Sequence, residues 1–422
     1  MKGVTNISEL IKTSSYNAVA VFFKMATLLG LNKILAIYVG PSGYMALGQL
    51  NSLMQMVGTF AAGGINSGVV KYTAEYHKDP KQQQKIWSSS VRITILCSLI
   101  MAAIVIAIHE SLAVLILDDI TYGILFIVYG ISIPFIAFNS IFLSILTGKK
   151  DIKRYVMASI VGSVIVFGLT TFLAVNFSLF GAMIALVLQQ SITFFVTLGF
   201  LYKAPWFSLR SFHAKPSNEI VFKLLKYSIV VVTIAICTPI AHIFIRDHIS
   251  QILGPEFAGY WEGMYRLSTA YLLFFTSTLS FYLLPRFSEL NSQKSIQKEL
   301  ISGYKLIIPL VSITAFCVYL FRDTLIVLLF DESFAAMESI FGWQMVGDTI
   351  KIASWILAYI ATAKAFIFLL VISEIVVNIL FALLVVFFLE NFGLSGAGMA
   401  HTATYSVYLL IMFLSLKCKK YI

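Results

Sequence analysis

The sequence reads NFSLFGAMIA at residues 176–185 and NFGLSGAGMA at residues 391–400, and these two stretches are identical at six of their ten positions. Three more matches follow the same order: Val39-Gly40-Pro41 with Leu253-Gly254-Pro255, Gly43-Tyr44 with Gly259-Tyr260, and Glu75 with Glu289. The matched residues are 214 to 216 positions apart, about half the length of the chain. This pattern indicates an internal repeat. Such repeats are typical of transporters in which two related helix bundles flank a substrate site.

The composition is that of a membrane protein. Hydrophobic residues make up 59% of the chain and charged residues only 12%, whereas about one quarter of a soluble domain is charged. Apolar runs long enough to cross a bilayer as helices occur throughout, and the alternation of outer-membrane strands is absent. The first apolar stretch, at residues 15–39, is too long for a signal peptide, so we predict an uncleaved first span.

No cofactor or metal site is expected. The four cysteines have no metal-binding or redox spacing, and three of them lie in apolar runs. Gly148-Lys149-Lys150 lacks the upstream glycine and the Ser or Thr of a Walker A motif. The chain therefore has no recognisable ATPase, and we do not expect it to be an enzyme.

Apolar runs between charged or Gly/Pro-marked breaks predict twelve spans, at residues 15–39, 46–71, 88–109, 120–147, 154–175, 179–202, 221–246, 257–285, 303–321, 335–361, 365–389 and 395–416. The longest interior polar segment, at residues 203–226, divides them into six and six. We therefore predict an all-α polytopic membrane protein with an N-terminal bundle at residues 1–202 and a C-terminal bundle at 227–422. An even number of spans in each bundle makes the two repeats parallel.

Lysine and arginine are concentrated in alternate connecting segments. Of the 30 basic residues, four lie within predicted spans and two, Arg246 and Arg322, lie in the other set of segments. The remaining 24 lie in the terminal segments and in every second loop. Because basic residues stay on the cytoplasmic side, both termini are predicted to be cytoplasmic. The net charge of +10 thus reflects topology, and no nucleic-acid partner is expected.

Several charged residues fall inside the predicted spans: Lys24, Lys33, Arg266 and Lys351, with the acids Glu262, Asp348 and Glu374. A charge facing lipid at mid-depth costs about 2.5–3.5 kcal/mol on insertion scales, so each needs a partner or water. The pairs Glu262/Arg266 and Asp348/Lys351 are spaced to neutralise themselves locally. The other hypothesis is that the four basic residues line a cationic, water-filled space between the halves, suited to phosphate. Lys33 has the further alternative of extending to the outer surface, and Glu374 of pairing with another helix or titrating.

Three segments resemble Wzx-type flippases of bacterial polysaccharide assembly: GINSGVVKY at 64–72, YLLP at 282–285 and WQMVGDTIK at 343–351. That group includes the O-antigen and lipid III flippases and is related to the MATE drug exporters within the MOP superfamily. The resemblance implies a two-lobed, V-shaped transporter of the bacterial inner membrane that works by alternating access. Its cargo would be an undecaprenyl-diphosphate-linked oligosaccharide, moved to the periplasmic leaflet.

The resemblance also bears on single residues. Lys24, Lys33, Asp348, Lys351 and Glu374 match the family pattern. Around residues 266–269 the chain departs from it, since Thr269 stands at an acidic position of the lipid III flippase and Arg266 replaces a small polar residue. This departure favours an O-antigen unit as cargo over lipid III itself.

Further roles follow as hypotheses. Tyr265, Trp343 and Gln344 are candidates for sugar contacts, and Asp348 and Glu374, with Glu262 as a charge partner, are the acids nominated for ion coupling or charge pairing. Other polysaccharide-assembly proteins, such as a polymerase or chain-length regulator, are candidate partners. A MATE-like drug or cation antiporter is the main alternative, although a cationic cavity argues against it. A membrane polymerase or glycosyltransferase is a further alternative, but the predicted periplasmic loops are short.

Overall fold

The computed structural model describes residues 7–212, 218–290, 292–419 and 421, and none of these residues lies in a β-strand. The chain forms two compact units, one of Met1–Leu31 and Leu50–Ala235 and one of Asn32–Gln49 and Ile236–Ile422. Residues 32–49 of the predicted first half thus belong to the second unit. The predicted linker at 203–226 belongs to the first unit, and its residues 213–217 lie outside the described residues.

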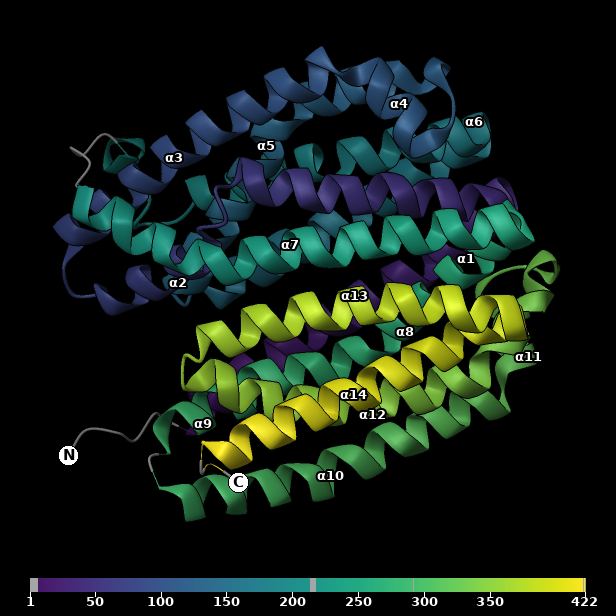
Figure 1. The fold of residues 1–422 in the computed structure, drawn as a ribbon. Helices are drawn as coiled ribbons and strands as arrows, with labels where there is room; N and C mark the ends of the chain where they lie inside the picture. The colour runs from purple at the N-terminus through teal and green to yellow at the C-terminus, as the bar shows by residue number, and fades with distance from the viewer. Residues whose placement is uncertain (1–6, 213–217, 291, 420, 422) are drawn as a thin grey trace. The chain divides into compact units, whose positions relative to one another are not determined.

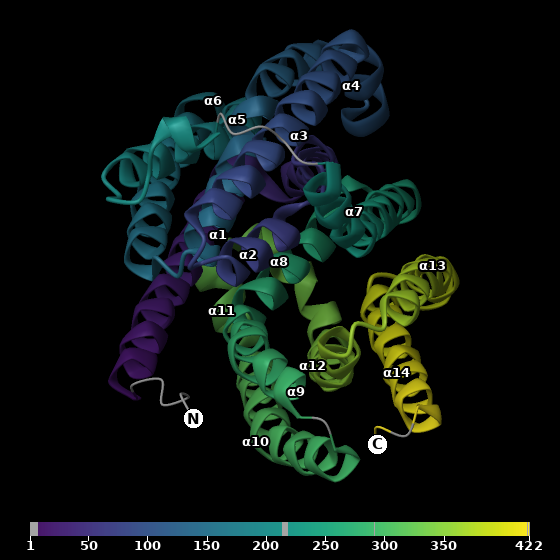
Figure 2. The ribbon, with the colours of Figure 1, turned by 90° about the vertical axis from the view of Figure 1, so that its left-hand side faces the viewer.

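The first unit is built around three long helices. It contains parts of α1 (Ile7–Ala61) and α7 (Asn218–Leu253), together with α2 (Asn66–Glu75), α3 (Pro80–Ala107), α4 (His109–Leu117), η1 (Ile120–Tyr122), α5 (Gly123–Gly148), α6 (Ile152–Tyr202) and η2 (Leu209–Phe212). Helix α5 packs against α3 and α6 (Figures 1 and 2). Side chains of α2, α3, α5, α6 and α7 share one buried apolar cluster, which includes Val69, Ile86, Ile145 and Leu224.

The second unit is centred on α12. Besides the remaining parts of α1 and α7, it contains α8 (Pro255–Thr278), the π-helical turn η3 (Leu279–Leu283), α9 (Leu284–Glu289), α10 (Gln293–Leu320), α11 (Arg322–Leu329), η4 (Glu332–Met337), α12 (Glu338–Ala363), α13 (Ile367–Phe392) and α14 (Ser395–Cys418). Helix α12 packs chiefly against α14, and also against α10 and α8. Figure 2 shows α13 beside α14, in agreement with their extensive packing.

Among the residues that the structure describes, eight helices are long and apolar enough to span a membrane. The helix α6, kinked at Ser178, covers two of the spans predicted from the sequence. The helix α1, kinked at Gly40, covers the first predicted span and residues 46–61 of the second, whose residues 66–71 lie in α2. Helices α8 and α12, predicted as the eighth and tenth spans, are not among the eight. They are also the helices that carry Glu262, Arg266, Asp348 and Lys351. The chain is thus an all-helical, multi-pass membrane protein, and the count of twelve spans stays a prediction.

The matching sequence segments have matching backbone irregularities. Gly40 and its counterpart Gly254 have φ of 71° and 108°, and Ser178 and its counterpart Gly393 have φ of 49° and 57°. All four values lie in the left-handed region that favours glycine. Each repeated NFxLxGA segment therefore bends the chain in the same way, just before a helix that begins or resumes.

Candidate functional site

Two arginines share one glutamate inside the second unit. Arg246 Nη1 of α7 lies 2.7 Å from Glu262 Oε2, and Arg266 Nε lies 2.8 Å from Glu262 Oε1. Arg246 Nε also donates a hydrogen bond to Gln49 Oε1 of α1, over 3.2 Å. The three ionised groups carry one net positive charge. The side chains of Arg246 and Glu262 are 1% and 3% exposed, whereas that of Arg266 is 16% exposed.

Aromatic rings cover both guanidinium groups. The Arg246 guanidinium lies 5.9 Å from the ring centroid of Trp261, and that of Arg266 lies 4.9 Å from the ring of Tyr44. A guanidinium loses less on desolvation over an aromatic face because the ring quadrupole attracts it. Only Arg266 of this cluster is open enough to contact a ligand.

The position of Arg246 corrects the sequence analysis, which assigned it to a connecting segment. It lies within α7, seven residues before the helix ends, and is buried. The physical reason is its pairing with Glu262, because a buried charge is tolerated when it is paired and hydrogen-bonded. With Arg246 inside, Arg322 is the one basic residue left in that set of segments.

A second polar cluster surrounds Asp348 of α12, which is fully buried. Its carboxylate accepts hydrogen bonds from Tyr271 of α8 at 2.6 Å and from Gln344 at 3.2 Å. Its Oδ1 also lies 3.0 Å from Nε2 of His401 on α14. The local pairing of Asp348 with Lys351 is not formed within 4 Å, since partners from two other helices occupy the carboxylate.

The Lys351 ammonium lies between two aromatic rings. Its Nζ is 5.1 Å from the ring centroid of Trp355 and 5.1 Å from that of Tyr405. No ion pair of Lys351 occurs within the described ranges. A cation held by rings rather than by an ion pair keeps its charge available to an anionic group.

Glu374 of α13 forms a third, smaller cluster. Its Oε1 accepts hydrogen bonds from Thr238 of α7 at 2.9 Å and from Asn378 at 3.0 Å. Across the described segments, no basic side chain lies within ion-pair distance of it. Glu374 is thus held by neutral donors, and it is partly accessible.

The two lysines of α1 lie in different units. Lys33 donates hydrogen bonds to the backbone carbonyls of Val327, at 2.7 Å, and Phe330. These carbonyls lie at the end of α11, so Lys33 satisfies acceptors that a helix terminus leaves open. Lys24 belongs to the first unit and its side chain is exposed. Of the four basic residues predicted to line one space, Arg266 thus pairs with Glu262, and Lys33 instead binds the carbonyls at the end of α11.

The candidate sugar-contacting residues have different surroundings. Gln344 is buried and donates to both Asp348 and Ser268. Tyr265 stacks on Trp261 with ring centroids 6.2 Å apart and touches His242 edge-on. Trp343 is 45% exposed. Of the three, Trp343 has the most surface to offer a ligand.

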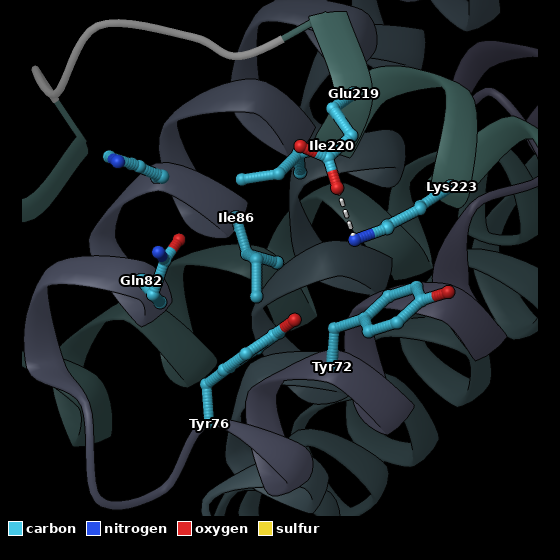
Figure 3. A pocket seen from close by; sticks show the side chains of 8 residues that line it. Tyr72, Tyr76, Gln82, Ile86, Glu219, Ile220 and Lys223 are labelled. Atoms are coloured by element: carbon cyan, nitrogen blue, oxygen red, sulfur yellow. Dashed lines mark hydrogen bonds and ion pairs between the residues drawn. The ribbon is translucent and has the colours of Figure 1, made fainter.

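The first unit has a pocket near the start of α7, with a volume of about 130 Å³. Figure 3 shows the Lys223 ammonium directed at the Glu219 carboxylate, which lies 2.6 Å away. The rings of Tyr72 and Tyr76 line the same pocket. The ion pair satisfies both charges locally. Nearby, burial beside the rings of Trp87 and Trp206 lowers the pKa of Lys149, whose ammonium donates to Gln83. We interpret this region as structural.

Sequence reasoning missed Arg246 and His401 as members of these clusters, and His242 as a ring contact of Tyr265. Arg246 contacts Glu262 from another helix, and His401 contacts Asp348 from another. The only signal in the sequence was a polar side chain inside an apolar run. The part of the chain that the structure describes contains no cluster of His, Cys, Asp or Glu suited to a metal ion.

Comparisons with known proteins identify the family of the chain and its fold. A family model described as "Polysaccharide biosynthesis protein" matches residues 10–291. The chain is 29% identical to the lipid III flippase of Escherichia coli (strain K12), over 95% of this chain and 96% of that protein. Among solved structures, an inward-facing MATE multidrug resistance transporter of the MOP superfamily aligns with a TM-score of 0.78 and 17% identity, covering 94% of each chain. The lipid II flippase MurJ in an inward closed conformation aligns with a TM-score of 0.73 and 16% identity, covering 97% of this chain and 89% of that one. The fold is thus shared with MOP superfamily transporters.

Proposed function

This chain belongs to the polysaccharide biosynthesis protein family, and on that premise we propose that it is a flippase for a lipid-linked oligosaccharide. The cargo is an undecaprenyl-diphosphate-linked oligosaccharide, such as an O-antigen repeat unit. It moves from the cytoplasmic to the periplasmic leaflet of the bacterial inner membrane. The protein acts as a transporter and not as an enzyme. The E. coli relative, which is 29% identical over nearly the whole chain, is named as a flippase of lipid III.

The basic groups of the second unit that have no acid of their own carry the proposal. Arg246 and Arg266 share a single carboxylate, and Lys351 is held by rings rather than by an acid. Arg266 and Lys351 therefore retain positive charge that a diphosphate would neutralise. Guanidinium and ammonium groups recognise phosphate through charge-assisted hydrogen bonds. We assign the diphosphate to Arg266 and Lys351 of the second unit. Lys24 of the first unit is proposed separately as a group that attracts the anionic head group.

The topology forms part of the proposal. We propose twelve spans in two related six-helix bundles with both termini in the cytoplasm. The matched kinks at Gly40 and Gly254, and at Ser178 and Gly393, support the duplication. The concentration of basic residues in alternate segments supports the orientation. Alternating access then exposes the head-group site to each side in turn, while the polyprenyl tail stays in lipid.

Coupling to an ion gradient is proposed for Asp348 and Glu374. Asp348 is joined to His401, and Glu374 is held by neutral donors. Asp348 is fully buried and Glu374 partly so, and a change of protonation away from bulk water alters the local electrostatic energy strongly. A proton taken up by either acid would favour one conformation of the second unit over another.

The test is transfer of a fluorescent undecaprenyl-diphosphate oligosaccharide between leaflets of liposomes that contain the purified protein, without ATP. We expect transfer by the wild type and its loss in Lys24→Ala/Arg266→Ala/Lys351→Ala. The control variant Lys294→Ala/Lys298→Ala removes two exposed basic residues of the second unit and should transfer normally. Normal transfer by the triple variant would refute the cationic site, and no transfer by folded wild type would refute the cargo.

The MATE-like architecture keeps drug or cation antiport as a second candidate, because an inward-facing MATE transporter shares the fold over 94% of the chain. A cationic drug would meet the net positive charge of Arg266 and Lys351, which disfavours it. Drug-susceptibility measurements on cells with and without the protein distinguish the two functions. Resistance to cationic drugs that depends on the protein would favour antiport.

A further inference from the structure

The first unit contains a second pocket whose lining carries no charge. Its volume is about 310 Å³, within the range of small-molecule sites. Five carboxamide side chains line it, from α1 (Asn51 and Gln55), α2 (Asn66) and α6 (Gln189 and Gln190). The hydroxyls of Thr59 and Ser140 add to this set. The whole pocket lies within the first unit.

The polar lining falls on helices that are otherwise apolar. Helices α1, α5 and α6 each count among the candidate spans. Amide groups facing hydrocarbon would have no hydrogen-bond partner, which is strongly unfavourable in a bilayer. Side chains of this kind on one wall therefore indicate a surface that faces water or a polar ligand.

Some of these amides are held in place by the protein itself. Asn66 Nδ2 donates to Ser140 Oγ at 2.6 Å. The side-chain carbonyl of Gln190 accepts from Asn139 at 3.2 Å, and Asn139 in turn accepts from Thr197 at 2.8 Å. This network fixes the orientation of Gln190 and directs its carbonyl to the protein.

Other amide groups keep their hydrogen-bonding capacity. Within the described residues, the side chains of Asn51, Gln55 and Gln189 make no hydrogen bond to the protein, and neither does the NH₂ group of Gln190. A carboxamide offers two donors and one acceptor oxygen. Sugar hydroxyls both donate and accept, so they match carboxamides on both counts. A phosphate offers only acceptors and favours the basic groups found in the second unit.

We propose that this amide-lined pocket binds the saccharide portion of the lipid-linked substrate. The inference rests on the proposed function and deepens it, because it gives sugar and diphosphate to different residues. Uncharged amides bind hydroxyl groups through directional hydrogen bonds, and a site built on such bonds rejects ligands that lack them. The pocket near Glu219 in Figure 3 is less suited, since its ion pair is already satisfied internally.

The experiment measures equilibrium binding to the full-length protein in nanodiscs with two probes. One is undecaprenyl-diphosphate oligosaccharide extracted from the source cells, and the other is undecaprenyl diphosphate without sugar. The test variant Gln55→Met/Gln189→Met removes two amides of similar length that make no bond in the protein. We expect its affinity for the sugar-bearing lipid to fall about tenfold, the loss of two neutral hydrogen bonds, with unchanged affinity for the bare lipid.

Two control comparisons accompany this variant. Asn176→Ala removes an amide of the same unit that bonds only to the carbonyl of Phe172, and it should bind both lipids as the wild type does. Gly58→Leu fills the pocket, whereas Gly58→Ala adds one carbon that meets Ile136 at an ordinary 3.7 Å. We expect Gly58→Leu alone of this pair to weaken binding of the sugar-bearing lipid selectively.

The outcomes separate the inference from the proposed function. If Gln55→Met/Gln189→Met weakens neither lipid, or weakens both equally, the saccharide site is refuted, whatever Arg266→Ala/Lys351→Ala does. If Arg266→Ala/Lys351→Ala weakens both lipids while the amide variant weakens only the sugar-bearing one, both assignments stand. If folded wild type binds neither lipid, the proposed function fails and the saccharide site with it.

Discussion

At the residue scale, Glu262 determines whether the second unit tolerates its buried arginines. The carboxylate contacts Arg246 through one oxygen and Arg266 through the other. Gly48 of α1 lies against it, since a Cβ there would come 2.6 Å from Glu262 Oε2. The acid is thus enclosed by groups that leave it little freedom.

We predict that Glu262→Gln destabilises the protein by about 3–5 kcal/mol, because it leaves the buried guanidinium of Arg246 and the partly exposed one of Arg266 without a counter-charge. Thermal unfolding in detergent measures the effect. Glu256→Gln on the same helix is the control, because Glu256 is exposed and should change the melting temperature little. Equal melting temperatures for the two variants would contradict the buried-charge account.

Ser178 is strained where its counterpart in the repeat is glycine. Its φ of 49° and ψ of −130° suit glycine, and a side chain there costs of order 1–3 kcal/mol. We predict that Ser178→Gly stabilises the protein by about 1 kcal/mol, and that Gly393→Ser destabilises it by a similar amount. Ser178→Ala keeps the Cβ and should give no gain in melting temperature. A gain from alanine would show that the hydroxyl, and not the backbone, is responsible.

At the element scale, the kinks of α6 and of the α13–α14 connection depend on a second glycine. A Cβ built on Gly181 would lie 2.0 Å from the carbonyl oxygen of Leu173, and one on Gly396 would lie 2.2 Å from that of Phe388. These distances are far below van der Waals contact. The repeated NFxLxGA segment therefore needs two things. Its third residue (Ser178 or Gly393) must adopt a positive φ, and its glycine (Gly181 or Gly396) must have no Cβ so that the backbone can approach closely.

We predict opposite effects for two alanine substitutions in α6. Gly181→Ala forces backbone apart and should destabilise the protein by about 1–3 kcal/mol. Gly199→Ala meets no atom within 4 Å and should stabilise the helix by about 0.5–1 kcal/mol. The two melting temperatures are compared under identical conditions. Similar shifts in the same direction would contradict the close-approach argument.

At the scale of the whole molecule, the proposed coupling to an ion gradient requires a group that responds to that gradient. Asp348 is bonded by Tyr271, Gln344 and His401 from three helices, so a change in its charge alters the packing of α8, α12 and α14 together. Such a coupled network can bias two conformations of a transporter.

We predict that Asp348→Asn abolishes the stimulation of lipid transfer by a proton gradient while slower transfer without a gradient continues. The liposome assay described above measures both rates. Glu390→Gln is the control, because Glu390 is an exposed acid near the end of α13. If Asp348→Asn is still stimulated by the proton gradient, Asp348 is not the coupling group, and Glu374 or another group is.

The sequence by itself determined the helical membrane class, because apolar runs of spanning length and the placement of basic residues are local properties of the chain. It also offered two local ion pairs as one alternative, of which Glu262–Arg266 forms and Asp348–Lys351 does not, and it contained the NFxLxGA repeat, whose kinks share one backbone conformation. Only the tertiary structure decided the remaining partners. Arg246 reaches Glu262 and His401 reaches Asp348 from other helices, and Lys33 binds the end of α11. Spacing along one helix does not specify such contacts, because packing between helices sets which buried polar groups meet.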